Sequence, residues 1–181
     1  EQVYIAQEVI VSALRASENT PVSHQTIDYK TIKEKNSGQE IPYLLQLTPS
    51  LVASSDAGTG IGYSSFRIRG VDMTRINITI NDIPLNDAES HSVFLVNMPD
   101  FVESVNSIQI QRGVGTSSNG AAAFGASVNM QTNSLSNKAF AEINNVFGAF
   151  NTRKHTLKAG TGLLDNNFAF DIRVSQISSD G

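Results

Sequence analysis

The sequence has no cysteine among its 181 residues, which excludes a disulfide framework, a thiolate zinc site and a cysteine nucleophile. It has no run of lysine or arginine, and its net charge of -4 gives no basic surface of the kind that binds nucleic acid. No stretch approaches the ~18 consecutive apolar residues of a membrane-spanning helix. The chain opens on Glu1 without a signal peptide, so we expect a processed or excised piece. Composition alone therefore predicts one acidic, soluble-looking domain.

Short periodic segments fill the chain up to Asn133. Phe66–Arg69 alternates most clearly, because it has one apolar and one cationic face and ends at Gly70. Asp28 or Thr31 is suited to cap a short helix that continues through Lys35. The other predictions are strands at Val22–Ile27, Arg75–Ile80, Ser107–Gln111 and Ser127–Gln131, helices at Gln39–Leu47 and Pro99–Val105, and a loop at Ser54–Ser65.

Three longer runs follow Asn133, at Phe140–Phe150, Thr152–Gly160 and Asn167–Ser178. Each is about ten residues long, which is the length of a tilted strand that crosses a bilayer. Half-buried sheets of soluble proteins alternate in the same way, so periodicity alone leaves both interpretations open.

Three groups of motifs occur in a specific order: Phe66–Gly70 before Ile78–Leu85, then Met98–Val105 before Ile108–Gly113, and finally Phe124–Thr132. Together they resemble the plug domain of TonB-dependent outer-membrane receptors. The pattern of that family runs IRG, then a DGVPL-like turn, then IERIEVVRGP, then YGSGAIGGVINIITK. The chain departs from it at Asn81, where Asp is usual, at Val114, where Pro is usual, and at Phe124, where Tyr is usual.

The resemblance implies an α+β fold, in which a plug domain with a small mixed β-sheet and short helices precedes antiparallel strands. These strands would begin a transmembrane β-barrel of about 22 strands. We expect a TonB-box segment and linker at residues 1–20, the plug domain at 21–133, and the first barrel strands at 134–181. Such a barrel needs more chain than is present, so we expect a receptor fragment. Its Leu135–Gly181 segment would be disordered, or paired with another copy through its unpaired strands.

The resemblance also places a TonB box near the N-terminus. Glu8, Val9, Ile10, Val11 and Ser12 form a β-branched segment that can add as a strand to a sheet edge of the TonB C-terminal domain. The alternative is a frayed terminal strand, or the last strand of a preceding domain.

Three arginines are the expected contacts between plug and barrel. Arg69 and Arg112 match the arginines of the two RG motifs, which in this family pair with carboxylates of the barrel wall. Arg67 lies two residues before Arg69, and we expect both on one strand face. Glu103 is a candidate local partner of these arginines. The alternative is an ordinary solvated strand face.

The substrate-binding apices of the plug are expected in its loops. The candidates are Asp56, Tyr63, Asp87, Glu89 and His91. The last three offer mixed oxygen and nitrogen donors, although acidic loop clusters are usually only solvated, so we expect no metal site. The glycines of residues 58–62 suggest a dinucleotide loop, but a strand follows them where that motif requires a helix.

The sequence thus predicts a TonB-dependent transport receptor without a cofactor, and no enzyme, because it holds no nucleophile elbow, phosphate loop or catalytic triad. The expected location is the outer membrane, and the expected substrate is an iron–siderophore or related iron chelate. Cobalamin, haem and glycans are the alternatives within the family. A soluble β-rich binding or adhesion module is the alternative outside it.

Overall fold

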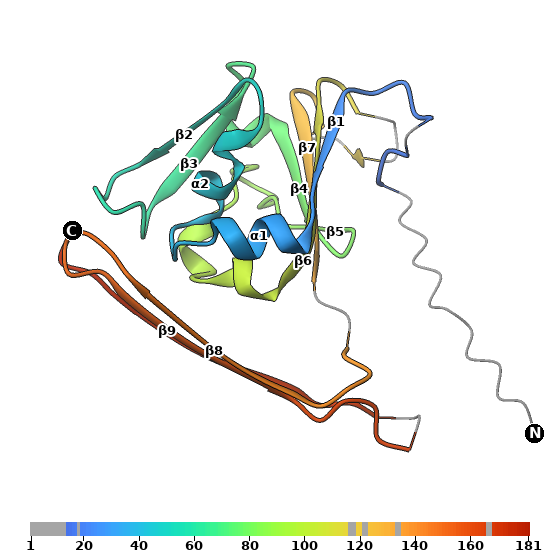
Figure 1. Cartoon of the computed structure of the whole chain (residues 1–181). Coiled ribbons are helices and arrows are strands. Elements are labelled where there is room, and N and C mark those ends of the chain that lie inside the picture. The colour runs from blue at the N-terminus through green and yellow to red at the C-terminus, as the bar shows by residue number, and fades with distance from the viewer. Residues whose placement is uncertain (1–13, 18, 116–118, 121–122, 133–134, 166–167) are drawn as a thin grey trace, which may run out of the picture.

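The computed structural model describes residues 14–17, 19–115, 119–120, 123–132, 135–165 and 168–181. A five-stranded mixed sheet, here called the central sheet, has the strand order β1-β6-β7-β4-β5 (Figure 1). Strands β4 and β7 run parallel, and the other neighbouring pairs run antiparallel. The strands are β1 (His24–Ile27), β4 (Ile76–Ile80), β5 (Ile83–Pro84), β6 (Val105–Arg112) and β7 (Ala126–Thr132).

The two faces of the central sheet differ in chemistry, because apolar and polar residues alternate along its strands. The register carries each kind across the sheet, so that the row Ile110–Val128–Ile78 lies beside the row Gln109–Asn129–Thr79. The apolar row belongs to the hydrophobic core. The polar row is buried as well, with Gln109, Asn129 and Thr79 only 4, 3 and 2 % exposed. The sheet is therefore covered on both faces.

Short helices contribute to the core beside the apolar face, and Ile32, Leu45, Leu95 and Val102 join it from them. The helix α1 begins where the sequence predicts, since the Asp28 carboxylate accepts a 2.9 Å hydrogen bond from the Thr31 amide. The helices are α1 (Tyr29–Lys35) and α2 (Ile41–Leu44), and the 3-10 turns are η1 (Leu45–Leu47), η2 (Met73–Arg75), η3 (Leu95–Asn97) and η4 (Phe101–Ser104).

Several predicted boundaries are wrong. The expected helix at Gln39–Leu47 is α-helical only over α2, and the expected helix at Pro99–Val105 is the 3-10 turn η4. The expected loop at Ser54–Ser65 begins and ends inside a hairpin of β2 (Leu51–Ser55) and β3 (Ser64–Ile68). Four strand positions there are serines, which gave no apolar period to recognise, and the hydroxyls of Ser54 and Ser65 lie 2.8 Å apart across the pair.

The three C-terminal runs form an antiparallel three-stranded sheet in the order β10-β9-β8, here called the C-terminal sheet. Its strands are β8 (Phe140–Phe147), β9 (Arg153–Gly160) and β10 (Asp171–Ser178). Figure 1 shows this sheet edge-on along one side of the molecule. The expectation that Leu135–Gly181 is disordered is wrong for the described residues of that segment, whereas pairing with another copy stays a prediction.

The two faces of the C-terminal sheet also differ. One face carries exposed apolar side chains, among them Ile143 at 72 %, Ile172 at 64 % and Val174 at 60 %. The opposite face carries Lys154, Thr156 and Lys158, which are buried. Across the residues that the structure describes, no helix is long and apolar enough to span a membrane.

Candidate functional site

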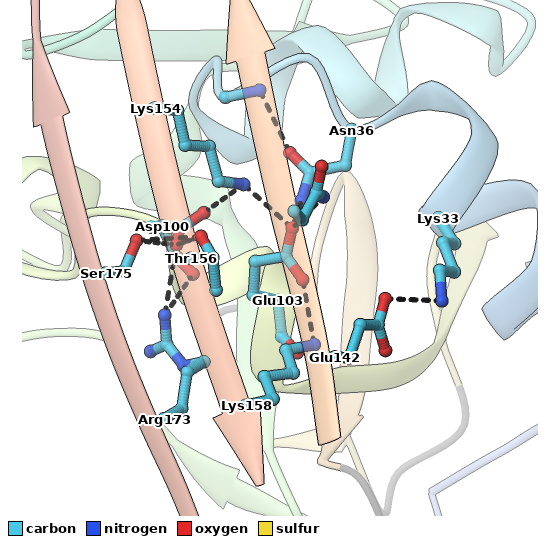
Figure 2. A network of polar contacts seen from close by, with 12 residues as sticks. Lys33, Asn36, Asp100, Glu103, Glu142, Lys154, Thr156, Lys158, Arg173 and Ser175 are labelled. Atoms are coloured by element: carbon cyan, nitrogen blue, oxygen red, sulfur yellow. Dashed lines mark hydrogen bonds and ion pairs between the residues drawn. The ribbon is translucent and has the colours of Figure 1, made fainter. Parts of the chain in front are cut away.

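Two carboxylates at the turn η4 face the C-terminal sheet (Figure 2). Asp100 precedes the turn in the left-handed conformation, with φ 54° and ψ 21°, which aspartate tolerates better than most residues. Glu103 follows three residues later, so the near-threefold repeat of a 3-10 turn places both side chains on one side. Val102, between them, is buried in the core and fixes the turn. The two acids are therefore held in place by hydrophobic packing.

The C-terminal sheet supplies the cations. Alternation along β9 brings Lys154, Thr156 and Lys158 to the face that meets η4, and β10 adds Arg173 and Ser175 (Figure 2). The Lys154 side chain has no exposed surface. A fully buried ammonium ion is tolerated only when it is paired and hydrogen-bonded.

The ammonium group of Lys154 bridges the two carboxylates. Its Nζ lies 2.6 Å from Asp100 Oδ1 and 2.8 Å from Glu103 Oε1. Lys158 Nζ lies 2.8 Å from Glu103 Oε2, and it donates a 2.6 Å hydrogen bond to the Glu103 carbonyl. Arg173 Nη1 lies 3.1 Å from Asp100 Oδ2. The ionic cluster is defined here as Asp100, Glu103, Lys154, Lys158 and Arg173. Its two carboxylates pair with three cationic side chains.

Neutral groups add hydrogen bonds to the cluster, although among the described residues the buried Asp100 Oδ1 is met only by the ion pair with Lys154. Asn36 Nδ2 and Asn144 Nδ2 donate to Glu103 Oε1 at 2.8 and 3.2 Å, and the Ser175 hydroxyl donates to Asp100 Oδ2. Burial raises the pKa of Glu103, but the hydrogen bonds and charges of Lys154 and Lys158 outweigh it and lower that pKa to about 2. Glu103 is thus ionised throughout the physiological range.

A third carboxyl group lies near the cluster. Glu40 directly precedes α2, its side chain makes no capping hydrogen bond there, and the residue is only 6 % exposed. Burial raises its pKa to about 7, an effect that the Asp100 charge adds to and a hydrogen bond from the Gly62 amide opposes. Glu40 therefore titrates in the physiological range, close to the Asp100 carboxylate of the ionic cluster.

The predicted arginine contacts do not form with the C-terminal sheet among the described residues. Arg112 donates instead to Ser23 Oγ at 2.8 Å, and Glu103 pairs with lysines of β9 rather than with the arginines. Arg69 lies beyond the end of β3 with φ 52°, so the expectation that it shares a strand face with Arg67 is wrong. The two RG motifs do meet, since a Cβ on Gly113 would lie 3.3 Å from Arg69 Nη1.

A pocket of about 350 Å³ gathers some of the predicted apex residues. Asp56, Tyr63 and Arg67 line it, together with Thr74 and Phe94. A carboxylate, a phenol, a guanidinium and an aromatic ring therefore share one opening near the β2–β3 hairpin.

The other apex candidates lie in the adjoining loop and do not line this pocket. Asp87 Oδ1 accepts hydrogen bonds from the amides of Glu89 and Ser90, which lowers the Asp87 pKa and occupies it as a turn cap. His91 has φ 56°. Within the described residues, no group of three acidic or histidine side chains is placed to hold a metal ion.

Two further predictions from the sequence concern the glycine-rich loop and the TonB box. The glycines of residues 58–62 form the turn between antiparallel strands β2 and β3, so the strand-to-helix context of a dinucleotide loop is not present there. The predicted TonB box, Glu8–Ser12, lies outside the described residues.

The sequence analysis did not predict the ionic cluster, although the sequence does indicate its cationic half. Lys154, Thr156 and Lys158 occupy alternate positions of a predicted strand, which indicates a polar face with two cations. The partners of these lysines could not be predicted, because Asp100 and Glu103 are more than fifty residues away in the sequence.

We predict that Lys154→Met lowers the free energy of unfolding by about 3–5 kcal/mol, because it leaves two buried carboxylates short of a partner. The matched control is Lys33→Met, since Lys33 pairs with Glu142 at 2.5 Å but its side chain is 50 % exposed. An exposed pair contributes about 1 kcal/mol or less, so the control should change little. Urea unfolding of both variants measures the difference, and equal effects would show that burial of the cluster is not what matters.

We also predict that Glu40→Gln removes a pH dependence of stability. The folded-state pKa of about 7 lies above the ordinary 4.5, so the native protein loses stability as pH rises between these values. The variant should therefore gain stability over wild type across this window, and the gain should level off above about pH 7. Urea midpoints from acid to neutral pH measure it, with Glu34→Gln on the exposed side of α1 as control. A gain that does not depend on pH would contradict the prediction.

Comparisons with known proteins give the family of this site. The profile of the TonB-dependent Receptor Plug Domain matches residues 16–127. No curated protein matches the chain. Among solved structures, FpvA of P. aeruginosa bound to heterologous pyoverdines is similar at 14 % identity with a TM-score of 0.72, and covers 89 % of this chain and 21 % of its own.

Two further structures show the same fold. The siderophore receptor PiuA from Acinetobacter baumannii has 22 % identity and a TM-score of 0.67, and covers 87 % of this chain and 21 % of its own. The ferric yersiniabactin uptake receptor FyuA from Yersinia pestis has 13 % identity and a TM-score of 0.65, and covers 85 % and 24 %. This chain thus spans less than a quarter of the length of these receptors. The profile match covers more than half of the chain, and the chain therefore belongs to the TonB-dependent receptors through their plug domain.

Proposed function

We propose that this chain is the plug and the first wall strands of a TonB-dependent outer-membrane transporter, and that it is a receptor and not an enzyme. The plug would comprise residues 21–133 and the wall strands residues 134–181. The observation that carries the proposal is the ionic cluster, which fastens a folded plug to one face of a sheet whose other face exposes a row of apolar side chains.

The apolar face of the C-terminal sheet supports a place in a membrane. Register aligns Ile143, Leu157 and Val174 in one row across the three strands. These side chains are 72, 49 and 60 % exposed. The three strands have eight residues each and extend about 26 Å, so at a tilt of about 40° they span about 20 Å, most of the ~25 Å apolar band of a membrane barrel. A soluble binding or adhesion module would leave this face in water, which disfavours that alternative.

The arginines of the RG motifs remain candidates for contacts with further wall strands. Arg112 Nε is buried and has no hydrogen-bond partner among the described residues, and Arg69 lies beside Gly113. We propose that these two arginines meet carboxylates of wall strands outside the C-terminal sheet. Arg67 lines the pocket, and we propose that it contacts the ligand rather than the barrel wall.

The ligand proposed for the pocket is a ferric siderophore or a related iron chelate. Arg67 offers a charge-assisted donor for an anionic chelate, and Tyr63 offers a ring and a hydroxyl. Among the similar structures are FpvA in complex with pyoverdine and iron, the ferric yersiniabactin uptake receptor FyuA and the ferric citrate transporter FecA. Asp87, Glu89 and His91 would border the same face from the neighbouring loop. Cobalamin, haem and glycans are the competing ligands.

TonB is the proposed energy-coupling partner. A peptide that covers Glu8–Ser12 should bind the TonB C-terminal domain by adding a strand to it. Ile10→Pro should abolish binding, because proline removes a backbone donor, whereas Ile10→Val should retain it. Isothermal titration measures this, with a known TonB box as positive control. Equal binding of the proline and valine peptides, or no binding by the unaltered peptide, would contradict the coupling role.

The ligand proposal predicts that Arg67→Gln in the intact receptor weakens ferric citrate or ferric pyoverdine binding about tenfold or more, through the loss of a charged contact. Lys30→Gln removes a positive charge from exposed α1, away from the pocket, and should leave binding unchanged. Calorimetric titration with both ferric chelates, cobalamin and haem distinguishes the ligand classes. Saturable binding of cobalamin or haem alone would overturn the iron assignment.

A further inference from the structure

The buried polar face of the central sheet needs a cover, and part of it is the short segment Leu14–Ala16, here called the strap. Gln111 Nε2 donates a 2.7 Å hydrogen bond to the Leu14 carbonyl. The Gln109 side chain binds both backbone groups of Ala16, accepting from its amide at 2.6 Å and donating to its carbonyl at 3.0 Å. The side-chain amide of Gln109 thus pairs with the strap as a neighbouring strand would.

Arg15 makes more hydrogen bonds to the central sheet than the other residues of the strap. Its Nε donates to Asn129 Oδ1 at 2.6 Å, and its Nη1 donates to Ser107 Oγ at 2.8 Å. Its Nη2 donates to the carbonyls of Ser107 and Asn129 at 3.1 and 3.2 Å. Ser107 belongs to β6 and Asn129 to β7, so one guanidinium group spans two neighbouring strands.

The surroundings of Arg15 show that the contact is built into the fold. Burial lowers the pKa of the guanidinium, and the negative charge of Asp82 opposes that shift. Asn129 is itself held by Thr79 and Asp82, to which its Nδ2 donates at 2.8 and 2.7 Å. The group that receives Arg15 is therefore fixed from β4 and from the turn that follows it.

We propose that Arg15 is a mechanical anchor, which holds the strap on the central sheet and is the main attachment that must break before a pull on the N-terminal segment loads the strands of that sheet. This inference rests on the proposed function, since only Ala13 separates Leu14 from the predicted TonB box Glu8–Ser12. Tension on that box reaches Arg15 before it reaches any strand of the central sheet. Release of the strap uncovers Gln109, Gln111 and Asn129 while the apolar core stays packed.

The fork of the guanidinium is what the anchor requires. Lysine keeps the charge but cannot bind Asn129 and Ser107 from fixed, diverging donors as arginine does. Arg15→Gln should therefore free the strap, and Arg15→Lys should free it in part. Arg153→Gln is the matched control, because Arg153 is exposed on β9 and donates locally to Asn151.

The first test is amide hydrogen exchange on the full chain in detergent micelles. In Arg15→Gln, the Ala16 amide should exchange about tenfold faster or more, because the strap opens locally without unfolding the sheet. The amides of Ile110 and Val128 should keep their wild-type rates. Unchanged exchange at Ala16 would overturn the proposal. Faster exchange at Ile110 and Val128 as well would also overturn it, because Arg15 would then be a general stabiliser of the sheet. If Arg15→Gln does not fold, Arg15→Lys is judged by the same criteria.

The second test pulls on the chain without TonB. Because the chain has no cysteine, Gln2→Cys offers a single attachment point for force spectroscopy. The first rupture should occur at lower force in Arg15→Gln than in wild type or Arg153→Gln, and later ruptures should be unchanged. An unchanged first rupture would contradict the anchor. Neither test uses TonB or a ligand, so a failed TonB titration would remove the proposed function while leaving these results intact.

Discussion

The burial of the Lys154 ammonium group is the constraint on which the arrangement of the two sheets depends. An ammonium ion with no exposed surface requires partners, and its two carboxylates come from Glu103 in η4 and from Asp100 just before that turn, outside the C-terminal sheet. Moving the plug away from β9 would leave Lys154, Asp100 and Glu103 to find water or new partners together. The contact is therefore specific in register, because apolar packing alone would tolerate sliding.

Pairing of buried polar groups also accounts for the many buried polar side chains, since the residues that the structure describes form one hydrophobic core cluster. The central sheet packs its isoleucines on one face and hydrogen-bonds glutamine and asparagine on the other. The C-terminal sheet points Lys154, Lys158 and Arg173 at the plug, whereas Ile143, Leu157 and Val174 lie on its outward face. Satisfied polar networks of this kind specify one arrangement of the packed surfaces. The strap and the ionic cluster are two such separable contacts.

Sequence patterns predicted the elements of the fold better than their partners. The alternation of β4, β6 and β7 and the cap at Asp28 were legible because each is a local effect. Strand β3 was predicted in part from Phe66–Arg69, but β2 and the start of β3 were missed because four of those positions are serines. Helix α2 was predicted too long because the spacing of its leucines does not distinguish α from 3-10 turns. Pairings such as Glu103 with Lys158 were not legible, since they depend on where two distant segments meet. The order of the motifs, rather than any one of them, indicated the family.

The most direct measurement of the contact between plug and wall is the conductance of the intact receptor in a planar bilayer as urea is added. If the ionic cluster fastens the plug, the double variant Asp100→Asn, Glu103→Gln should open conducting channels at a lower urea concentration than wild type. Asp72→Asn combined with Glu34→Gln removes the same number of charges at exposed positions and should behave as wild type. Opening of the double variant and wild type at the same urea concentration would contradict the role of the cluster.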